Sequence, residues 1–157
     1  MRKQIIAHKP AVDSNSEHNW LNLEKMAQVE ITSESSNHPI EAAFMPNSNN
    51  HWQADAAGEQ SIILQFDEPQ RITHIRLLFQ ESHQERSQEF LLCWSADDGK
   101  SYQDITRQQF NFSSPDSTQQ LEDYSVQLNA VTTLKLCITP DISRGNAHAS
   151  LHEWRIA

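Results

Sequence analysis

The sequence predicts an all-β protein, an antiparallel sandwich of the jelly-roll type. Apolar residues alternate with polar ones over many short runs, turn-forming residues separate these runs, and no amphipathic stretch of helical period reaches a dozen residues. Because successive side chains of a strand point to opposite faces, each run is typical of a strand with one face in a core. Many short strands with almost no helix indicate a single sandwich.

The N-terminal part of the 157-residue chain differs from the rest. Residues 1–19 are polar and irregular, so we expect an N-terminal arm there and one sandwich domain over residues 20–157, a length typical of single domains. The spacing of the four apolar residues within 20–26 fits either a short helical turn or an extended segment.

The alternating runs then give the expected strands in order. They lie around Val29 and Ile31 and over residues 62–66, 75–79, 90–94, 124–128 and 134–138. Pro69 marks a turn over residues 67–70, and the Asp98-Gly99 pair is a hairpin signal. The longest connection, residues 33–60, is rich in Asn, Ser and His, and we expect it beside the loop over residues 80–88 at one end of the sandwich.

Composition excludes several classes of protein. The formal charge of −9, from 12 Lys and Arg against 21 Asp and Glu, argues against nucleic-acid binding, and no apolar run approaches the ~20 residues that span a bilayer. The three glycines lie too far apart to form a phosphate-binding loop. Cys93 and Cys137 form no metal-binding pair, and each lies in a strand-like run as a small core residue.

The N-terminus carries two basic residues followed by only three apolar ones, which is too short for a secretory signal. We therefore expect a cytoplasmic protein with reduced cysteines.

Six segments of the chain carry the motifs of a known family: residues 41–44, 51–54, 62–66, 72–77, 95–102 and 149–156. They resemble the discoidin domain, also called the coagulation-factor 5/8 C-type domain or family 32 carbohydrate-binding module, and the resemblance covers roughly residues 20–157. The runs 87–90, 107–113 and 140–143 make the chain similar to small stand-alone bacterial members described as carbohydrate-binding. The resemblance implies a galactose-binding-like jelly roll with its ligand loops at one end.

Many members of that family hold a structural calcium beside the ligand loops, through an Asp of an Asp-Gly pair and a Glu of the last strand. Glu153 matches the second position, but Met45-Pro46 replaces the Asp-Gly pair. Calcium takes six to eight oxygen ligands, and Asn47, Asn49 and Asn50 could supply neutral oxygens in place of the missing carboxylate. The alternative role of Glu153 is to pair with a cation or to cap backbone amides. No other cofactor is expected.

Polar side chains on three loops are the candidate ligand-binding residues, because amides, carboxylates and guanidinium groups match the hydroxyls of a sugar. They are Asn47, Asn50, His51, Glu81, His83, Arg86, Arg144, Asn146 and His148. His148 and His152 would lie ~13 Å apart on a strand, too far for one metal ion, so we interpret the eight histidines as solvated or hydrogen-bonded surface residues.

Binding is favoured over catalysis, since no nucleophile with a base and no Gly-x-Ser-x-Gly elbow is present. The leading hypothesis is non-catalytic carbohydrate binding. The alternative is a protein–protein interaction scaffold inside the cell, favoured by the altered calcium position and by ligand loops whose aromatic residues are only Phe44 and Trp52. An exposed edge strand or the N-terminal arm could also support a homodimer.

Overall fold

The computed structural model describes residues 18–45, 48–143 and 145–157. Most of the expected N-terminal arm, and the candidate residues Asn47 and Arg144, lie outside these ranges. The described part contains two one-turn helices, α2 (Leu23–Met26) and α3 (Glu41–Phe44). Its strands are β1 (Ala27–Ile31), β2 (Trp52–Ala57), β3 (Gln60–Gln80), β4 (Arg86–Ser95), β5 (Gln103–Phe112), β6 (Gln119–Thr139), β7 (His148–Leu151) and β8 (Glu153–Ile156).

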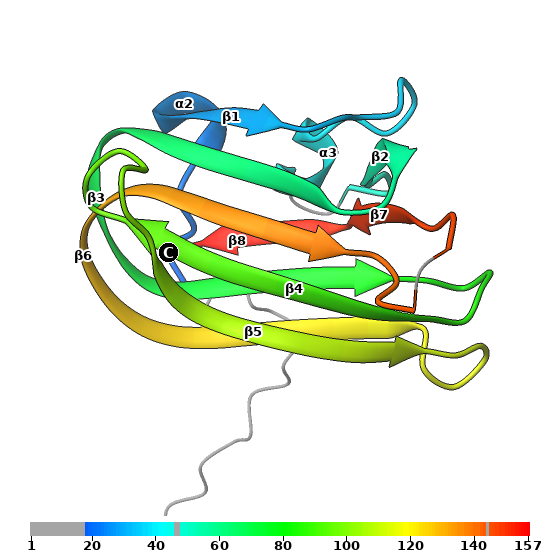
Figure 1. Ribbon diagram of the computed structural model, residues 1–157. Coiled ribbons are helices and arrows are strands. Elements are labelled where there is room, and N and C mark those ends of the chain that lie inside the picture. The colour runs from blue at the N-terminus through cyan, green and yellow to red at the C-terminus, as the bar shows by residue number, and fades with distance from the viewer. Residues whose placement is uncertain (1–17, 46–47, 144) are drawn as a thin grey trace, which may run out of the picture.

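All strand pairs are antiparallel, which confirms the predicted all-β sandwich. The main sheet has the order β1-β3-β6-β4-β5, with β8 also paired to β3, and β2 pairs with β7. The long strands β3 and β6 curve together at one end, so that each contributes to both layers of the sandwich (Figure 1). Neither helix of the described residues is long and apolar enough to cross a membrane.

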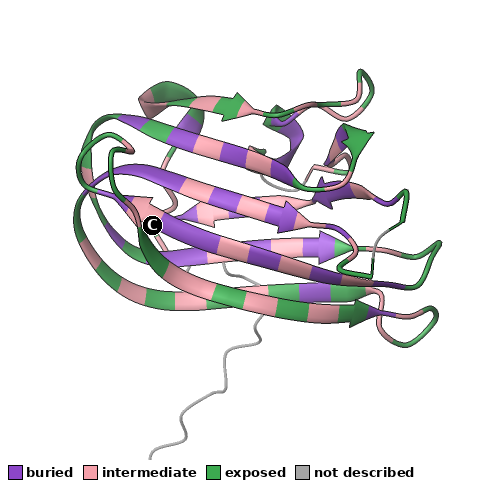
Figure 2. Ribbon diagram, in the orientation of Figure 1, coloured by how far each residue is buried: buried purple, intermediate pink, exposed green. Residues whose placement is uncertain are grey.

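The core fills the space between the two layers. Burial alternates along β3, β4 and β6, as the purple bands in Figure 2 show, because every second side chain points inward. The largest fully buried side chains include Trp52, Trp154, Phe79, Phe90 and Phe112. Cys93 is also buried, as expected, and burial raises the pKa of its thiol to about 11, whereas Cys137 is half-buried.

The expected turn over residues 67–70 is wrong, because the chain continues there as a strand. Residues 62–66 and 75–79 belong to the single strand β3, and residues 124–128 and 134–138 belong to β6. The register between β3 and β6 shifts between Gln65 and His74, and Pro69 lies in this irregular stretch. Because proline has no amide hydrogen to donate, it is tolerated where the ladder is interrupted. Pro69 therefore marks a bend within a strand.

The hairpin between β4 and β5 confirms the Asp-Gly signal. Asp98 and Gly99 adopt the left-handed region, with φ of 60° and 84°. Asp97 accepts hydrogen bonds from the hydroxyl of Ser95 at 2.6 Å and from the amide of Ser101 at 2.9 Å. Hydrogen bonds from Ser101 and then Ser95 lower the pKa of Asp97 to about 2, because they favour the ionised carboxylate.

Asp97→Ala is expected to lower the melting temperature at pH 7 but to have little effect near pH 2. The folded-state pKa lies below the unfolded value of about 4, so the contribution of Asp97 is present above pH 4 and is lost as the pH falls toward 2. Thermal unfolding at several pH values measures this, with the exposed Asp116→Ala as the matched control. An equal loss at pH 7 and pH 2 would contradict the assignment.

Candidate functional site

A pocket of about 770 Å³ opens at the end of the sandwich where the turns after β3, β5 and β6 lie, on the right in Figure 1. The loop over residues 33–60 contributes to this pocket together with the turn after β3, as the sequence predicted. All the lining side chains carry a polar group. They are His38, His51, Gln53, Gln80, Glu81, Ser82, His83, Gln84, Thr118, Gln119, Asn146, His148, Ser150 and His152.

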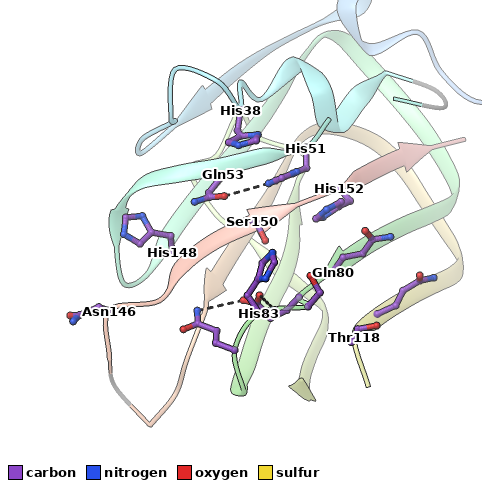
Figure 3. Close-up of a pocket in the computed structure, with 14 residues that line it drawn as sticks. His38, His51, Gln53, Gln80, His83, Thr118, Asn146, His148, Ser150 and His152 are labelled. Atoms are coloured by element: carbon purple, nitrogen blue, oxygen red, sulfur yellow. Dashed lines mark hydrogen bonds between the residues drawn. The ribbon is translucent and has the colours of Figure 1, made fainter. Parts of the chain in front are cut away.

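Three stacked imidazoles form one wall of the pocket, in a row that Figure 3 shows from upper left to right. The ring centroids of His38 and His51 are 4.2 Å apart, and those of His51 and His152 are 4.4 Å apart. The ring planes within each pair are within 20° of parallel. We call His38, His51 and His152 the histidine column.

Backbone hydrogen bonds bring the three column residues together from separate segments. His38 lies between β1 and α3, and its carbonyl accepts from the amide of Gln53 in β2 at 3.2 Å. His51 immediately precedes β2. His152 lies between β7 and β8, and its amide donates to the carbonyl of Leu78 in β3 at 2.9 Å. The column therefore depends on the pairing of strands that are distant in the chain.

Asn50 determines which ring nitrogen of His38 carries the proton. The amide Nδ2 of Asn50 donates to the carbonyl of Asn37, so Oδ1 is the acceptor that faces Nδ1 of His38 at 2.8 Å. The same Oδ1 accepts from the backbone amide of His51 at 2.8 Å. Nδ1 of His38 is therefore protonated, and in the neutral ring Nε2 is a hydrogen-bond acceptor. Asn50 supports the column and does not itself line the pocket.

His148 has the same tautomer for a similar reason. Its Nδ1 lies 2.9 Å from the carbonyl oxygen of Ala54 in β2, which can only accept. The Nε2 of the neutral ring is then also an acceptor. This hydrogen bond ties β7 to β2 and fixes the ring at the side of the pocket that lies farthest from His152 in Figure 3. Two histidines thus offer acceptor nitrogens to a ligand that carries hydroxyl groups.

Burial makes two rings of the column, those of His51 and His152, resist protonation. Burial lowers the pKa of His152 to about 4, and the neighbouring His51 and His38 lower it further, while Glu81 has the opposite effect. Burial also lowers the pKa of His51, assisted by His38 and opposed by a hydrogen bond with Gln53. At neutral pH both rings are therefore uncharged and act as neutral donors and acceptors.

Glu81 is held in the pocket by Arg86, which lies underneath and not in the lining. The guanidinium Nε donates to the Glu81 carboxylate at 2.7 Å, and Nη1 donates to the carbonyl of Pro140 at 2.8 Å. Arg86 is only 4% exposed. Burial opposes ionisation of Glu81, but the hydrogen bonds from Arg86 and from the His83 amide outweigh it, so the pKa lies below its usual value.

Five of the nine expected ligand-binding residues line the pocket: His51, Glu81, His83, Asn146 and His148. Asn146 lies at the rim, at the far left of Figure 3. Asn50 and Arg86 hold pocket residues from behind, and Asn47 and Arg144 lie outside the described residues. The other nine of the 14 lining residues, among them His38, Gln53, Gln80 and His152, were not expected there. His152 was interpreted as a surface residue, whereas it is half-buried next to β8, which pairs with β3.

The described residues do not fit the calcium that the family resemblance implied. Glu153, the expected carboxylate ligand, forms an ion pair with Arg155 on the same strand. Among residues 18–45, 48–143 and 145–157, no group of three or more His, Cys, Asp and Glu side chains could hold a metal ion. Glu153 therefore has its alternative expected role, which is to pair with a cation, here the guanidinium of Arg155.

The fold and the pocket define a β-sandwich with a polar cavity at its loop end. Residues 28–152 match the F5/8 type C domain, and the chain belongs to this family. This finding confirms the resemblance that the sequence motifs indicated. No curated protein sequence matches the chain significantly.

Solved structures share this fold at low sequence identity. A CBM32 module from Clostridium perfringens, in complex with GalNAc-β-1,3-galactose, has a TM-score of 0.66 and 19% identity, over 87% of this chain and 98% of that one. A pectin-binding carbohydrate-binding module has a TM-score of 0.61 and 22% identity, over 82% and 88%. The CBM32 of AlyQ, in complex with 4,5-unsaturated mannuronic acid, has a TM-score of 0.58 and 20% identity, over 89% and 98%.

Proposed function

We propose that the protein is a non-catalytic carbohydrate-binding module and that the pocket at the loop end is its glycan site. The observation that carries this proposal is the pocket itself: about 770 Å³ lined throughout by side chains with hydrogen-bonding groups. This volume lies within the range of small-molecule sites. Membership of the F5/8 type C family and the sugar-binding structural neighbours support the same class of ligand.

The lining supplies the groups that a polyhydroxyl ligand requires. Sugar hydroxyls donate to the Nε2 atoms of His38 and His148 and to the carboxylate of Glu81, whose two oxygens match a pair of neighbouring hydroxyls. The amides of Gln53 and Gln80 both donate and accept. A sugar ring would form several such directional hydrogen bonds at once, and their positions make the pocket selective for particular arrangements of hydroxyl groups.

His83→Ala is expected to weaken glycan binding by about tenfold, roughly the loss of one hydrogen bond. His83 is exposed and lines the pocket below the histidine column in the view of Figure 3. The purified protein is screened on a glycan array that includes galactose, GalNAc-β-1,3-galactose, pectin and 4,5-unsaturated mannuronic acid, and each hit is then titrated calorimetrically.

His18→Ala is the matched control, because His18 stacks on His74 and does not line the pocket. It is expected to bind like the unmodified protein. A blank array would contradict carbohydrate binding and favour the protein-partner hypothesis. Equal weakening by His18→Ala and His83→Ala would show that the glycan binds elsewhere.

A further inference from the structure

We propose that glycan binding in this pocket is switched off by acid, because the histidine column remains stacked only while its rings are uncharged. This inference rests on the proposed function and adds its regulation. Three adjacent imidazoles from three segments line one wall, with centroid separations of 4.2 Å and 4.4 Å. Figure 3 shows that the column makes up much of the wall above His83.

The first step of the argument is the repulsion between charged rings. Two protonated imidazoles stacked at these separations would hold like charges about 4 Å apart in a partly buried wall, where water screens them less than it does on an open surface. The column can therefore accept a second proton only by separating its rings. Because all three rings line the pocket, such a separation changes the shape of the binding surface.

The second step concerns the buried nitrogen of His152. Its Nδ1 is buried and has no hydrogen-bond partner among the described residues. A neutral imidazole can leave this nitrogen as an unprotonated lone pair, with its proton on Nε2. The imidazolium carries a proton on both nitrogens, so protonation would place an unsatisfied N–H donor in a buried position. His152 must move to become charged.

The third step is the charge that surrounds the column. Glu81 is the only carboxylate among the lining residues, and its charge is already paired with Arg86. Glu153 follows His152 in the chain, but Arg155 holds its carboxylate. The other ionisable side chains of the lining are His83 and His148, and an imidazole cannot contribute negative charge. Among the lining residues, no carboxylate other than the already paired Glu81 is therefore available to stabilise a charged column.

The pKa values give the range of the switch. The pKa of His152 is lowered to about 4 and that of His51 is lowered from 6.5. The unfolded chain therefore binds protons below pH 6.5 that His51 and His152 do not bind in the folded chain, so stability decreases as the pH falls from 6.5 toward 4. Glycan affinity is expected to be constant from pH 8 to 6.5 and to fall with a midpoint below 6.5.

Two measurements on the full chain test the switch. Histidine-ring NMR of the free protein is expected to show His152 titrating near pH 4. Calorimetry with the array hits named above is expected to show the acid-dependent loss of affinity. His152→Gln, which keeps a polar side chain but cannot be protonated, should make the pH profile shallower. His18→Gln removes a histidine outside the pocket and should keep the original profile.

An ordinary titration of His152, or the same pH profile with and without His152→Gln, would overturn the switch. Binding that stays constant down to pH 4 would do so as well. The NMR titration separates this failure from failure of the proposed function. If His152 titrates near pH 4 and none of the glycans binds at any pH, the carbohydrate site is refuted, and the switch is refuted with it.

Discussion

Arg86→Met is expected to destabilise the protein by about 3–5 kcal/mol, the usual cost of removing one partner from a buried ion pair. The Arg86 side chain is 1% exposed and that of its partner Glu81 is 14% exposed. Methionine fills a similar volume but leaves the Glu81 carboxylate without its cation. The carbonyl of Pro140 also loses a donor, so the turn after β6 loses a contact with β4.

A chain of hydrogen bonds extends the effect of this substitution into the interior. Nη1 of Arg86 donates to Gln88, Gln88 donates to Gln120 at 3.0 Å, and Gln120 donates to Glu122 at 3.0 Å. Gln88 is 0% exposed and Gln120 is 2% exposed. Removing one member of a buried polar network lowers the free energy of unfolding, because the remaining donors and acceptors cannot form hydrogen bonds with water instead. The loss of Arg86 is therefore expected to weaken hydrogen bonds as far as Gln120 and Glu122 in β6.

Urea unfolding of the variants measures this cost. Arg107→Met is the matched control, because Arg107 pairs with Glu89 across the strands at 3.4 Å and its side chain is 56% exposed. An exposed pair of this kind contributes less than about 1 kcal/mol. Adding Glu81→Gln to Arg86→Met should recover part of the loss, since the uncompensated charge is then removed. Similar costs for Arg86→Met and Arg107→Met would contradict the buried-pair interpretation.

The sequence contained enough information to predict the strands but not their continuity. Alternation was visible because each run has one face in the core. The residues around Pro69 suit a turn and a bend equally well. The choice between them depends on β6, which pairs with β3 on both sides of the bend and contains the left-handed Ala130 near its own curve. That pairing is a long-range property, and no local pattern carries it.

The site was predictable in part for a similar reason. His51, Glu81 and His83 could be expected at one end because polar loops joining antiparallel strands gather there. The histidine column could not, since its stacking depends on backbone bonds between distant segments such as Gln53 and His38, or His152 and Leu78. A local sequence pattern predicts which face of its own strand a residue lies on. It does not predict which side chain from another segment will pack against that residue.

Arg86 is a residue that local sequence patterns placed in the binding site although the structure does not. Its place in a polar loop suggested a ligand-binding side chain, whereas the structure buries it beneath the pocket. Its partners explain the difference: Glu81 is five residues away, but the carbonyl of Pro140 is 54 residues away. A charged residue is buried where such partners satisfy its donors, and these partners become apparent only in the folded chain.

Trp52→Ala is expected to destabilise the protein by about 3–5 kcal/mol, the usual cost of truncating a large buried aromatic residue. Trp52 is 0% exposed, begins β2 and pairs with Leu151 of β7. Its indole Nε1 donates to the carbonyl of Ser33 at 3.1 Å, which holds the segment after β1 against β2. Removing the ring therefore opens a cavity and releases this segment.

The same substitution should also abolish glycan binding, because Trp52 lies between two pocket residues. Along a strand, neighbouring side chains point to opposite faces, so an inward Trp52 directs His51 and Gln53 outward into the pocket. Unfolding by urea and calorimetric titration with the array hits measure the two effects on one sample. Trp94→Ala is the matched control, since Trp94 is half-buried on β4 and does not line this pocket.

Trp94→Ala is expected to cost less stability and to leave glycan affinity unchanged. Trp52→Phe separates the two roles of Trp52: phenylalanine keeps most of the buried area but cannot donate to Ser33. If affinity falls with Trp52→Phe while stability is largely kept, the hydrogen bond to Ser33 positions the pocket wall. If Trp52→Ala retains full affinity at a temperature where it is folded, β2 does not present the glycan-binding residues and the site must be assigned elsewhere.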